Sequence, residues 1–104
     1  SYISVWVIAA FPEEIIYRGF IMSRLSRALG GSNWSWWAAA LLSSTLFGAL
    51  HYYQGWAGMI VTGLAGFFLA ATYLFVRRNL WVTIIAHGLI DTIGMTAKYF
   101  GAAQ

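Results

Sequence analysis

The sequence predicts an all-α protein, a polytopic bundle of transmembrane helices with about four spans in a single domain, residues 1–104. Hydrophobic residues make up 61% of the chain and charged residues only 9%, whereas a soluble domain has about 25% charged residues. The apolar residues form runs long enough to cross a bilayer as helices. These runs lack the period-two alternation of membrane β-strands. So few charges cannot cover a water-soluble surface, and we expect an integral membrane protein.

The charged and sulfur-containing residues exclude several other classes of protein. The net charge is +3, but the six basic residues are scattered or paired, so nucleic acid is not an expected partner. Cysteine is absent, which excludes disulfides and thiolate metal sites. The chain begins at Ser1, without the charged region of a signal peptide. We therefore expect it to be the core of a longer helical membrane domain.

The first apolar segment, residues 1–25, is interrupted by Pro12. Proline suits the first turn of a helix and kinks a helix interior, and two acids follow it directly, where they favour a helix N-terminus. We expect an apolar lead-in that ends near Phe11 and a helix that starts or bends at Pro12. A Gly-Gly-Ser-Asn loop at 30–33 ends this part of the chain.

Three tryptophans at positions 34, 36 and 37 precede the second apolar segment and indicate an interfacial belt. Glycines at 58, 63 and 66 in the third segment would allow close helix packing in lipid. The remaining spans are expected at 38–50, 56–76 and 80–100, with turns at 51–55 and 77–79 and a frayed end at 101–104.

The basic residues indicate the topology. With four alternating spans, Arg24 and Arg27 at the end of the first segment lie on the same side as Arg77 and Arg78 at the end of the third. The positive-inside rule makes that side cytoplasmic. We expect a multi-pass protein, and the membrane we expect is a prokaryotic plasma membrane. Lys98 lies near the other side.

The first polar cluster is Glu13-Glu14-x-x-x-Arg18, which holds two of the three acidic residues. Residues four apart share a helix face, so Glu14 and Arg18 are predicted to pair. Glu13 is turned about 100° away and stays free, as a general base in a low-dielectric pocket must be. Alternatively, both acids only favour the helix N-terminus after Pro12. Ionisable groups at membrane depth are costly, however, and usually functional.

Two further clusters each carry a histidine. Phe47-x-x-x-His51 and His87-x-x-x-Asp91 each place two side chains on one helix face. Taken alone, His51 could be an interfacial residue, and the His87–Asp91 pair could simply lock two helices together. At 1.5 Å per residue, His87 lies about 12 Å into its span and His51 about 20 Å into its own. The two meet at one depth only if the helices tilt or the second span starts later than residue 38.

Every acidic residue and every histidine falls in these three clusters. Burying them separately would be costly, so we expect one shared polar cavity. Its natural chemistry is attack by an activated water on a carbonyl, with amide hydrolysis the best fit. Glu13 would take the proton, and histidines or backbone groups would stabilise the oxyanion. Alternatively, His51, His87 and Glu13 could bind Zn²⁺ and leave a fourth position for water, although the H-E-x-x-H signature is absent.

In this order, E-E-x-x-x-R, F-x-x-x-H and H-x-x-x-D resemble the CAAX-protease and bacteriocin-processing family of intramembrane endopeptidases, also called the CPBP or Abi family. The match covers most of the chain, from Pro12 to the fourth span. The resemblance implies an all-helical fold with a conical cavity in the membrane, and usually more helices than this chain contains. It implies a glutamate protease without a cofactor, with a zinc metalloprotease as the alternative. The implied substrates are peptides or membrane-protein segments, prenylated CAAX peptides among them.

The resemblance also implies roles for individual residues. Glu13 would activate water together with His51, while His87 and Asp91 would form the oxyanion-stabilising side. Asp91 stands where some members have asparagine, so it is either protonated or acts by orienting His87. The implied supporting residues are Glu14, Arg18 and Phe47.

Two other functions could use the same clusters. A non-catalytic membrane protein of this fold, such as an immunity factor, a chaperone or a scaffold, would keep the residues without turnover. A proton or ion pathway also uses intramembrane carboxylates and histidines. A pathway needs polar groups strung across the membrane, whereas these look gathered in one place. Membrane lipid and a peptide substrate are the partners we expect.

Overall fold

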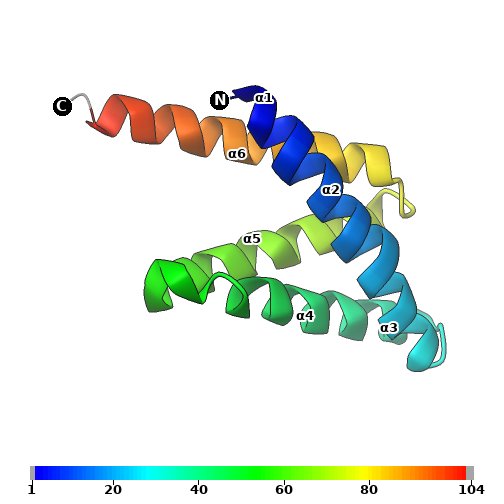
Figure 1. The fold of residues 1–104 in the computed structure, drawn as a ribbon. Coiled ribbons are helices and arrows are strands. Elements are labelled where there is room, and N and C mark those ends of the chain that lie inside the picture. Colours follow the sequence, from blue (N-terminus) through cyan, green and yellow to red (C-terminus); the bar gives the residue numbers. More distant parts are fainter. Residues whose placement is uncertain (1, 103–104) are drawn as a thin grey trace.

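The computed structural model describes residues 2–102, which are helical apart from their turns and contain no strand (Figure 1). The predicted all-α class is confirmed. A first helix is built from α1 (Tyr2–Ser4), α2 (Phe11–Glu14) and α3 (Met22–Ala28), joined by wider π-helical stretches at Val5–Ala10 and Ile15–Ile21. The remaining elements are α4 (Asn33–Ala49), a 3₁₀ turn (Tyr52–Gln54), α5 (Gly55–Phe75) and α6 (Leu80–Ala102).

A helix was predicted to start or bend at Pro12. The first helix continues through this residue, so it does not start there, and the bend stays a prediction. Proline lacks an N–H and crowds the carbonyl four residues before it. The backbone widens just ahead of it, where the Phe11 N–H donates to the Trp6 carbonyl, five residues back. Such wide turns are often found at functional sites. Here a second one follows the two glutamates directly and contains Arg18.

α4 and α5 form a closely packed pair. α4 begins at Asn33, earlier than predicted, because the Ser32 side chain caps it by accepting a hydrogen bond from the Ser35 N–H at 3.3 Å. Where the helices are closest, a Cβ on Gly48 would lie 2.8 Å from the Met59 carbonyl oxygen and 3.0 Å from the Gly63 Cα. Of the glycines expected to allow close packing, Gly63 lies at this contact and Gly66 lies against the Phe47 ring, whereas Gly58 faces only the Gln54 side chain.

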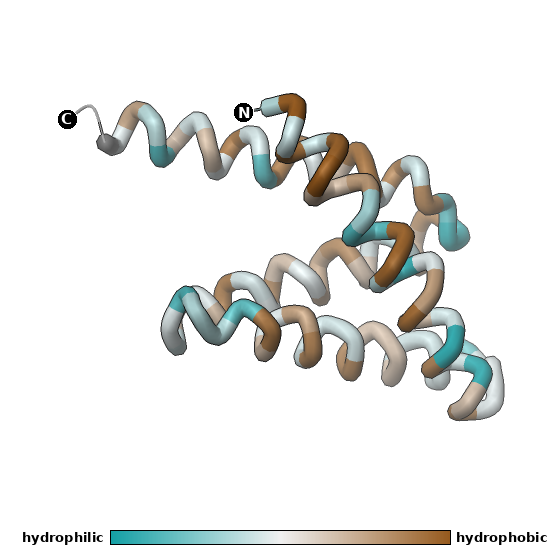
Figure 2. The backbone as a smooth tube through the Cα atoms, in the orientation of Figure 1, coloured by the Kyte–Doolittle hydropathy of each residue, from teal (hydrophilic) through white to brown (hydrophobic). Residues whose placement is uncertain are grey.

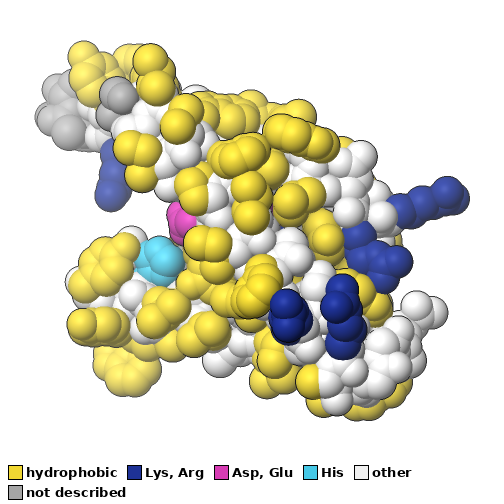
Figure 3. Space-filling model, turned by 45° about the vertical axis from the view of Figure 1, so that its right-hand side comes forward, with side chains coloured by type: hydrophobic (Ala, Val, Ile, Leu, Met, Phe, Trp, Pro, Cys, Tyr) yellow, Lys and Arg dark blue, Asp and Glu magenta, His cyan; other side chains and the backbone are white. Residues whose placement is uncertain are grey.

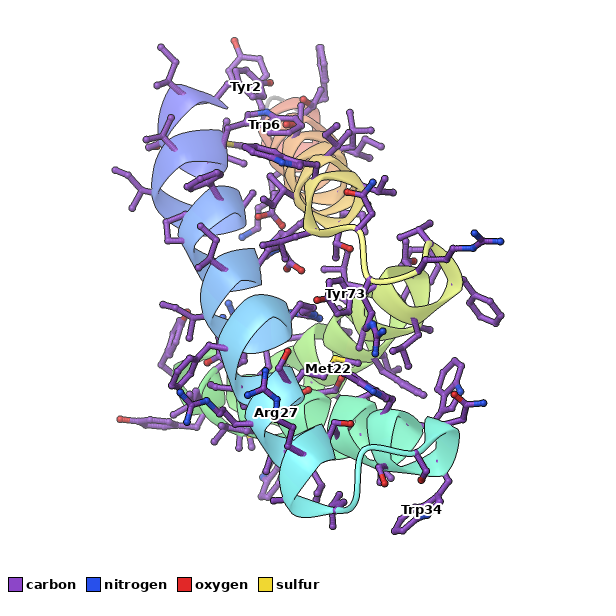
Figure 4. The ribbon with its side chains drawn as sticks, turned by 90° about the vertical axis from the view of Figure 1, so that its right-hand side faces the viewer. Tyr2, Trp6, Met22, Arg27, Trp34 and Tyr73 are labelled. Carbon is purple, nitrogen blue, oxygen red and sulfur yellow. The ribbon has the colours of Figure 1, made fainter. Side chains whose placement is uncertain are left out.

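The core lies where the first helix crosses this pair. Figure 4 shows Met22 on the first helix and Tyr73 on α5 turned toward the space between their helices. Side chains from α3, α4 and α5 make up this cluster: Met22, Ala39, Ala40, Ala70 and Tyr73. Three of the five are alanines, so the helix backbones approach closely here as well.

The turn before α6 is formed by Arg77 and Arg78, whose φ angles are +56° and +61°. Such positive values are uncommon for residues other than glycine. The Arg78 guanidinium lies over the Trp36 ring, 4.6 Å from its centroid, which ties the turn to the start of α4. The predicted polar turn is thus present. The predicted frayed end is wrong for residues 101 and 102, which continue α6, while 103 and 104 lie outside the described residues.

α6 leaves the α4–α5 pair at an angle and packs against the N-terminal half of the first helix (Figures 1 and 4). The Trp6 ring covers Gly88, and its Nε1–H donates to Thr92 Oγ1 at 3.1 Å. One turn away, the Tyr2 and Thr96 hydroxyls lie 2.8 Å apart.

The outer surface is suited to lipid. Large apolar side chains such as Trp56, Phe75 and Ile3 are more than three-quarters exposed, and Figure 2 shows apolar positions along every helix. Within residues 2–102, two helices are long and apolar enough to cross a membrane, at Tyr52–Phe75 and Leu80–Gly101. These two helices favour a membrane protein, and the count of four spans stays a prediction.

Candidate active site

A cavity of about 500 Å³ opens between the first helix, α6 and the α4–α5 pair. All four predicted catalytic side chains line it: Glu13, His51, His87 and Asp91. In Figure 3 an acidic and a histidine side chain face each other across a hollow between apolar surfaces. Residues from three separate sequence clusters thus share one polar cavity.

Behind this cavity lies a buried ion pair on the first helix. Arg18 Nη1 donates to Glu14 Oε2 at 3.3 Å, and Arg18 Nη2 donates to the Gly66 carbonyl on α5. The guanidinium also lies over the Phe47 ring, 5.7 Å from its centroid. Both charged side chains are almost fully buried. The predicted pairing of Glu14 with Arg18 is present, and it attaches the first helix to α5 and α4.

His87 is the centre of the polar network. Its Nδ1 lies 2.5 Å from Glu14 Oε2, and its Nε2 lies 3.1 Å from Asp91 Oδ2. A neutral imidazole offers one donor and one acceptor, yet both nitrogens here face carboxyl oxygens. Either the ring carries two protons or one of the carboxyls is protonated. The cluster therefore carries one more proton than a neutral imidazole between two ionised carboxylates would.

Glu13 differs from its neighbour Glu14 in what surrounds it. The Glu13 side chain is 29% exposed, whereas Glu14 is fully buried. Its Oε1 lies 4.0 Å from His87 Nε2, which is too long for a hydrogen bond. Its oxygens therefore remain available to a water or substrate in the cavity.

His51 has a defined tautomer because its Nδ1 lies 2.7 Å from the Phe47 carbonyl oxygen. A carbonyl can only accept, so Nδ1 carries the proton and Nε2 of the neutral ring is left as an acceptor. The Phe47 ring packs against both histidines, with centroid distances of 4.7 Å to His51 and 6.4 Å to His87. Phe47 is thus placed to orient both imidazoles.

Sequence reasoning missed two features of this site. The first is the contact between Glu14 and His87, which are 73 residues apart; spacing within one helix cannot report it. The second is Lys98, which lines the same cavity. The heptad-like spacing of Asp91 and Lys98 on α6 is a signal that could have found it.

The described residues contain no group of three His, Asp or Glu side chains arranged to hold a metal ion. His87 has both ring nitrogens in contact with carboxyl oxygens. A zinc ion held by His51, His87 and Glu13 would have to displace Asp91 from Nε2 or Glu14 from Nδ1. The zinc alternative stays a prediction, which chelation tests below.

The fold and the site define a helical membrane protein with an acid–histidine cavity between its helices. Residues 1–93 match the family described as Rce1-like, type II CAAX prenyl endopeptidase. The chain belongs to this family, as the three motifs indicated, and the match includes all three of them. The family is one of CAAX prenyl endopeptidases. Comparison with curated proteins and with solved structures gives no match.

Proposed function

We propose that the chain forms the catalytic core of an intramembrane endopeptidase that hydrolyses a peptide bond near the C-terminus of a prenylated CAAX substrate. Such a substrate ends in a prenylated cysteine, two aliphatic residues and a final residue. The observation that carries the proposal is that Glu13, His51, His87 and Asp91 line one cavity while Glu14 and Arg18 are buried behind it.

In the proposed mechanism, a water held between Glu13 and His51 attacks the scissile carbonyl carbon. Glu13 takes one proton from this water as the new C–O bond forms. The carbonyl oxygen becomes an oxyanion, which accepts a hydrogen bond from the His87–Asp91 side. Glu13 then passes its proton to the leaving amine as the C–N bond breaks. The products are a carboxylic acid and an amine, and Glu13 returns to its starting state.

The supporting residues fix this geometry. Glu14 holds His87 through Nδ1 and is itself held by Arg18. A misplacement of about 1 Å in a reacting group can lower the rate about 100-fold. We therefore assign Glu14, Arg18 and Phe47 as positioning residues.

The arginine-rich end of the molecule, visible in Figure 3, is assigned to the cytoplasmic side under the positive-inside rule.

The test is cleavage of prenylated and unprenylated CAAX peptides by the full-length protein in liposomes, read by mass spectrometry. Glu13→Gln keeps the size of the side chain but removes the base, and we expect it to lower kcat at least about 100-fold. Arg27→Gln, a change at an exposed cation away from the cavity, is the matched control. Thermal unfolding of all variants checks that they fold.

Each reaction is run with and without a zinc chelator. Cleavage that is lost in Glu13→Gln and insensitive to chelator supports a glutamate protease. Cleavage abolished by the chelator and restored by zinc would assign a metalloprotease. A fully active Glu13→Gln variant would contradict the mechanism, and a protein that folds but cleaves no peptide would favour the non-catalytic scaffold.

A further inference from the structure

Lys98 is a basic residue on the wall of the catalytic cavity. Arg18 forms a buried ion pair with Glu14, so its charge is already neutralised. The other arginines, at positions 24, 27, 77 and 78, do not line the cavity. Lys98 is exposed, and no carboxylate among residues 2–102 lies within ion-pair distance of it. It therefore offers an uncompensated positive charge to whatever enters the cavity.

Lys98 shares one face of α6 with the residues assigned to the chemistry. His87, Asp91 and Lys98 are spaced by four and seven residues, and at 100° per residue all three lie within about 40° of one another. The cavity lining confirms this arrangement, since Gly94 and Met95 lie on it between Asp91 and Lys98. The face is acidic at the His87–Asp91 end and basic at the Lys98 end.

Along this face, the backbone separation of His87 and Lys98 is longer than an extended three-residue peptide, so the reach of the Lys98 side chain has to make up the difference. His87 and Lys98 are eleven residues apart, about 16 Å along the helix, and a helical side chain leans back toward the N-terminus, which brings the ammonium group closer to His87. An extended chain covers about 3.3 Å per residue. Three residues therefore span about 10 Å, the distance from the scissile carbonyl of a CAAX peptide to its terminal carboxylate.

We propose that Lys98 binds the C-terminal carboxylate of the substrate and so places the bond three residues before it at Glu13. This assignment rests on the proposed function and adds to it a determinant of specificity. The carboxylate is attracted to Lys98 and repelled by Glu13 and Asp91, so the peptide binds in one direction only. The enzyme then selects a peptide bond by its distance from the C-terminal carboxylate of the substrate.

The experiment compares three prenylated peptides on the full-length protein in liposomes: a free acid, its C-terminal amide, and a free acid longer by one residue. An exposed ion pair contributes up to about fivefold in binding. We expect the wild type to cleave the free acid with about fivefold higher kcat/KM than the amide, mostly through KM. The longer peptide, whose carboxylate lies about 3.3 Å further on, behaves like the amide.

Lys98→Gln is expected to lower the free-acid kcat/KM to the amide value, and Lys98→Arg to keep the preference. The control Arg27→Gln leaves all three values unchanged. A preference for the free acid that survives in Lys98→Gln, or an equal loss on acid and amide, would overturn the assignment.

A second readout separates this inference from the proposed function. Binding of fluorescent free-acid and amide peptides is measured on the Glu13→Gln protein, which needs no turnover. A carboxylate preference in binding that disappears with Lys98→Gln supports the inference even if the wild type cleaves nothing. Cleavage by the wild type without any carboxylate preference supports the endopeptidase and refutes the role of Lys98.

Discussion

Replacing Arg18 with methionine tests whether the buried ion pair holds the site together. Methionine keeps much of the side-chain volume and removes the charge. Glu14 Oε2 would lose one charge-assisted hydrogen bond, about 1.5–3 kcal/mol, and the Gly66 carbonyl would lose its buried donor, about 1–3 kcal/mol. The sum agrees with the loss of about 3–5 kcal/mol typical of breaking a buried pair by removing one partner.

We therefore expect Arg18→Met to lower the free energy of unfolding by about 3–5 kcal/mol. The assay is reversible denaturant unfolding in detergent micelles, followed by tryptophan fluorescence. Glu14→Gln and the double variant Glu14→Gln/Arg18→Met complete a double-mutant cycle, in which we expect a coupling of about 2 kcal/mol. A loss below about 1 kcal/mol for Arg18→Met, with no coupling in the cycle, would refute the reasoning that this pair is a buried, shared attachment point.

Two further predictions concern packing and topology. Gly88→Val puts a side chain where the Trp6 ring lies, so it should destabilise the protein by about 1–3 kcal/mol in the same unfolding assay. Adding Trp6→Ala should recover part of this loss of stability. If Gly88→Val does not destabilise the protein, the contact between the Trp6 ring and this glycine is contradicted. For topology, single cysteines at Arg27 and Arg77 in this cysteine-free chain should both react with a membrane-impermeant maleimide only from the cytoplasmic side. Labelling of the two from opposite sides would contradict the span count of four.

The parts of the site that depend on one helix could be predicted from the sequence. A spacing of four residues places two side chains on one face, so the Glu14–Arg18 and Asp91–His87 contacts followed from position alone. The gathering of all acids and histidines was also predictable, because polar groups in an apolar chain are costly to bury separately.

The parts that depend on how helices cross could not be read from spacing. The contact between Glu14 and His87 joins the first helix to α6, and its existence depends on the inclination of α6. Pro12 was predicted to begin or bend a helix. The helix instead continues through it, with a wider π-helical turn just ahead of the proline. Ahead of Pro12, Trp6 and Tyr2 form hydrogen bonds with α6 that spacing within one helix does not report.

The single oxygen Glu14 Oε2 has a consequence for which substitutions the chain can tolerate. This atom accepts from Arg18 on its own helix and faces His87 on α6, while the other oxygen, Oε1, is buried without a hydrogen-bond partner among the described residues. An amide at position 14 presents one acceptor and one donor on a fixed fork, and one orientation would aim an N–H at a cation. Aspartate would be too short to reach both partners. The adjacent residues Glu13 and Glu14 are therefore not interchangeable, although both are glutamates. Glu13 is open to the cavity, whereas one oxygen of Glu14 contacts side chains of two helices.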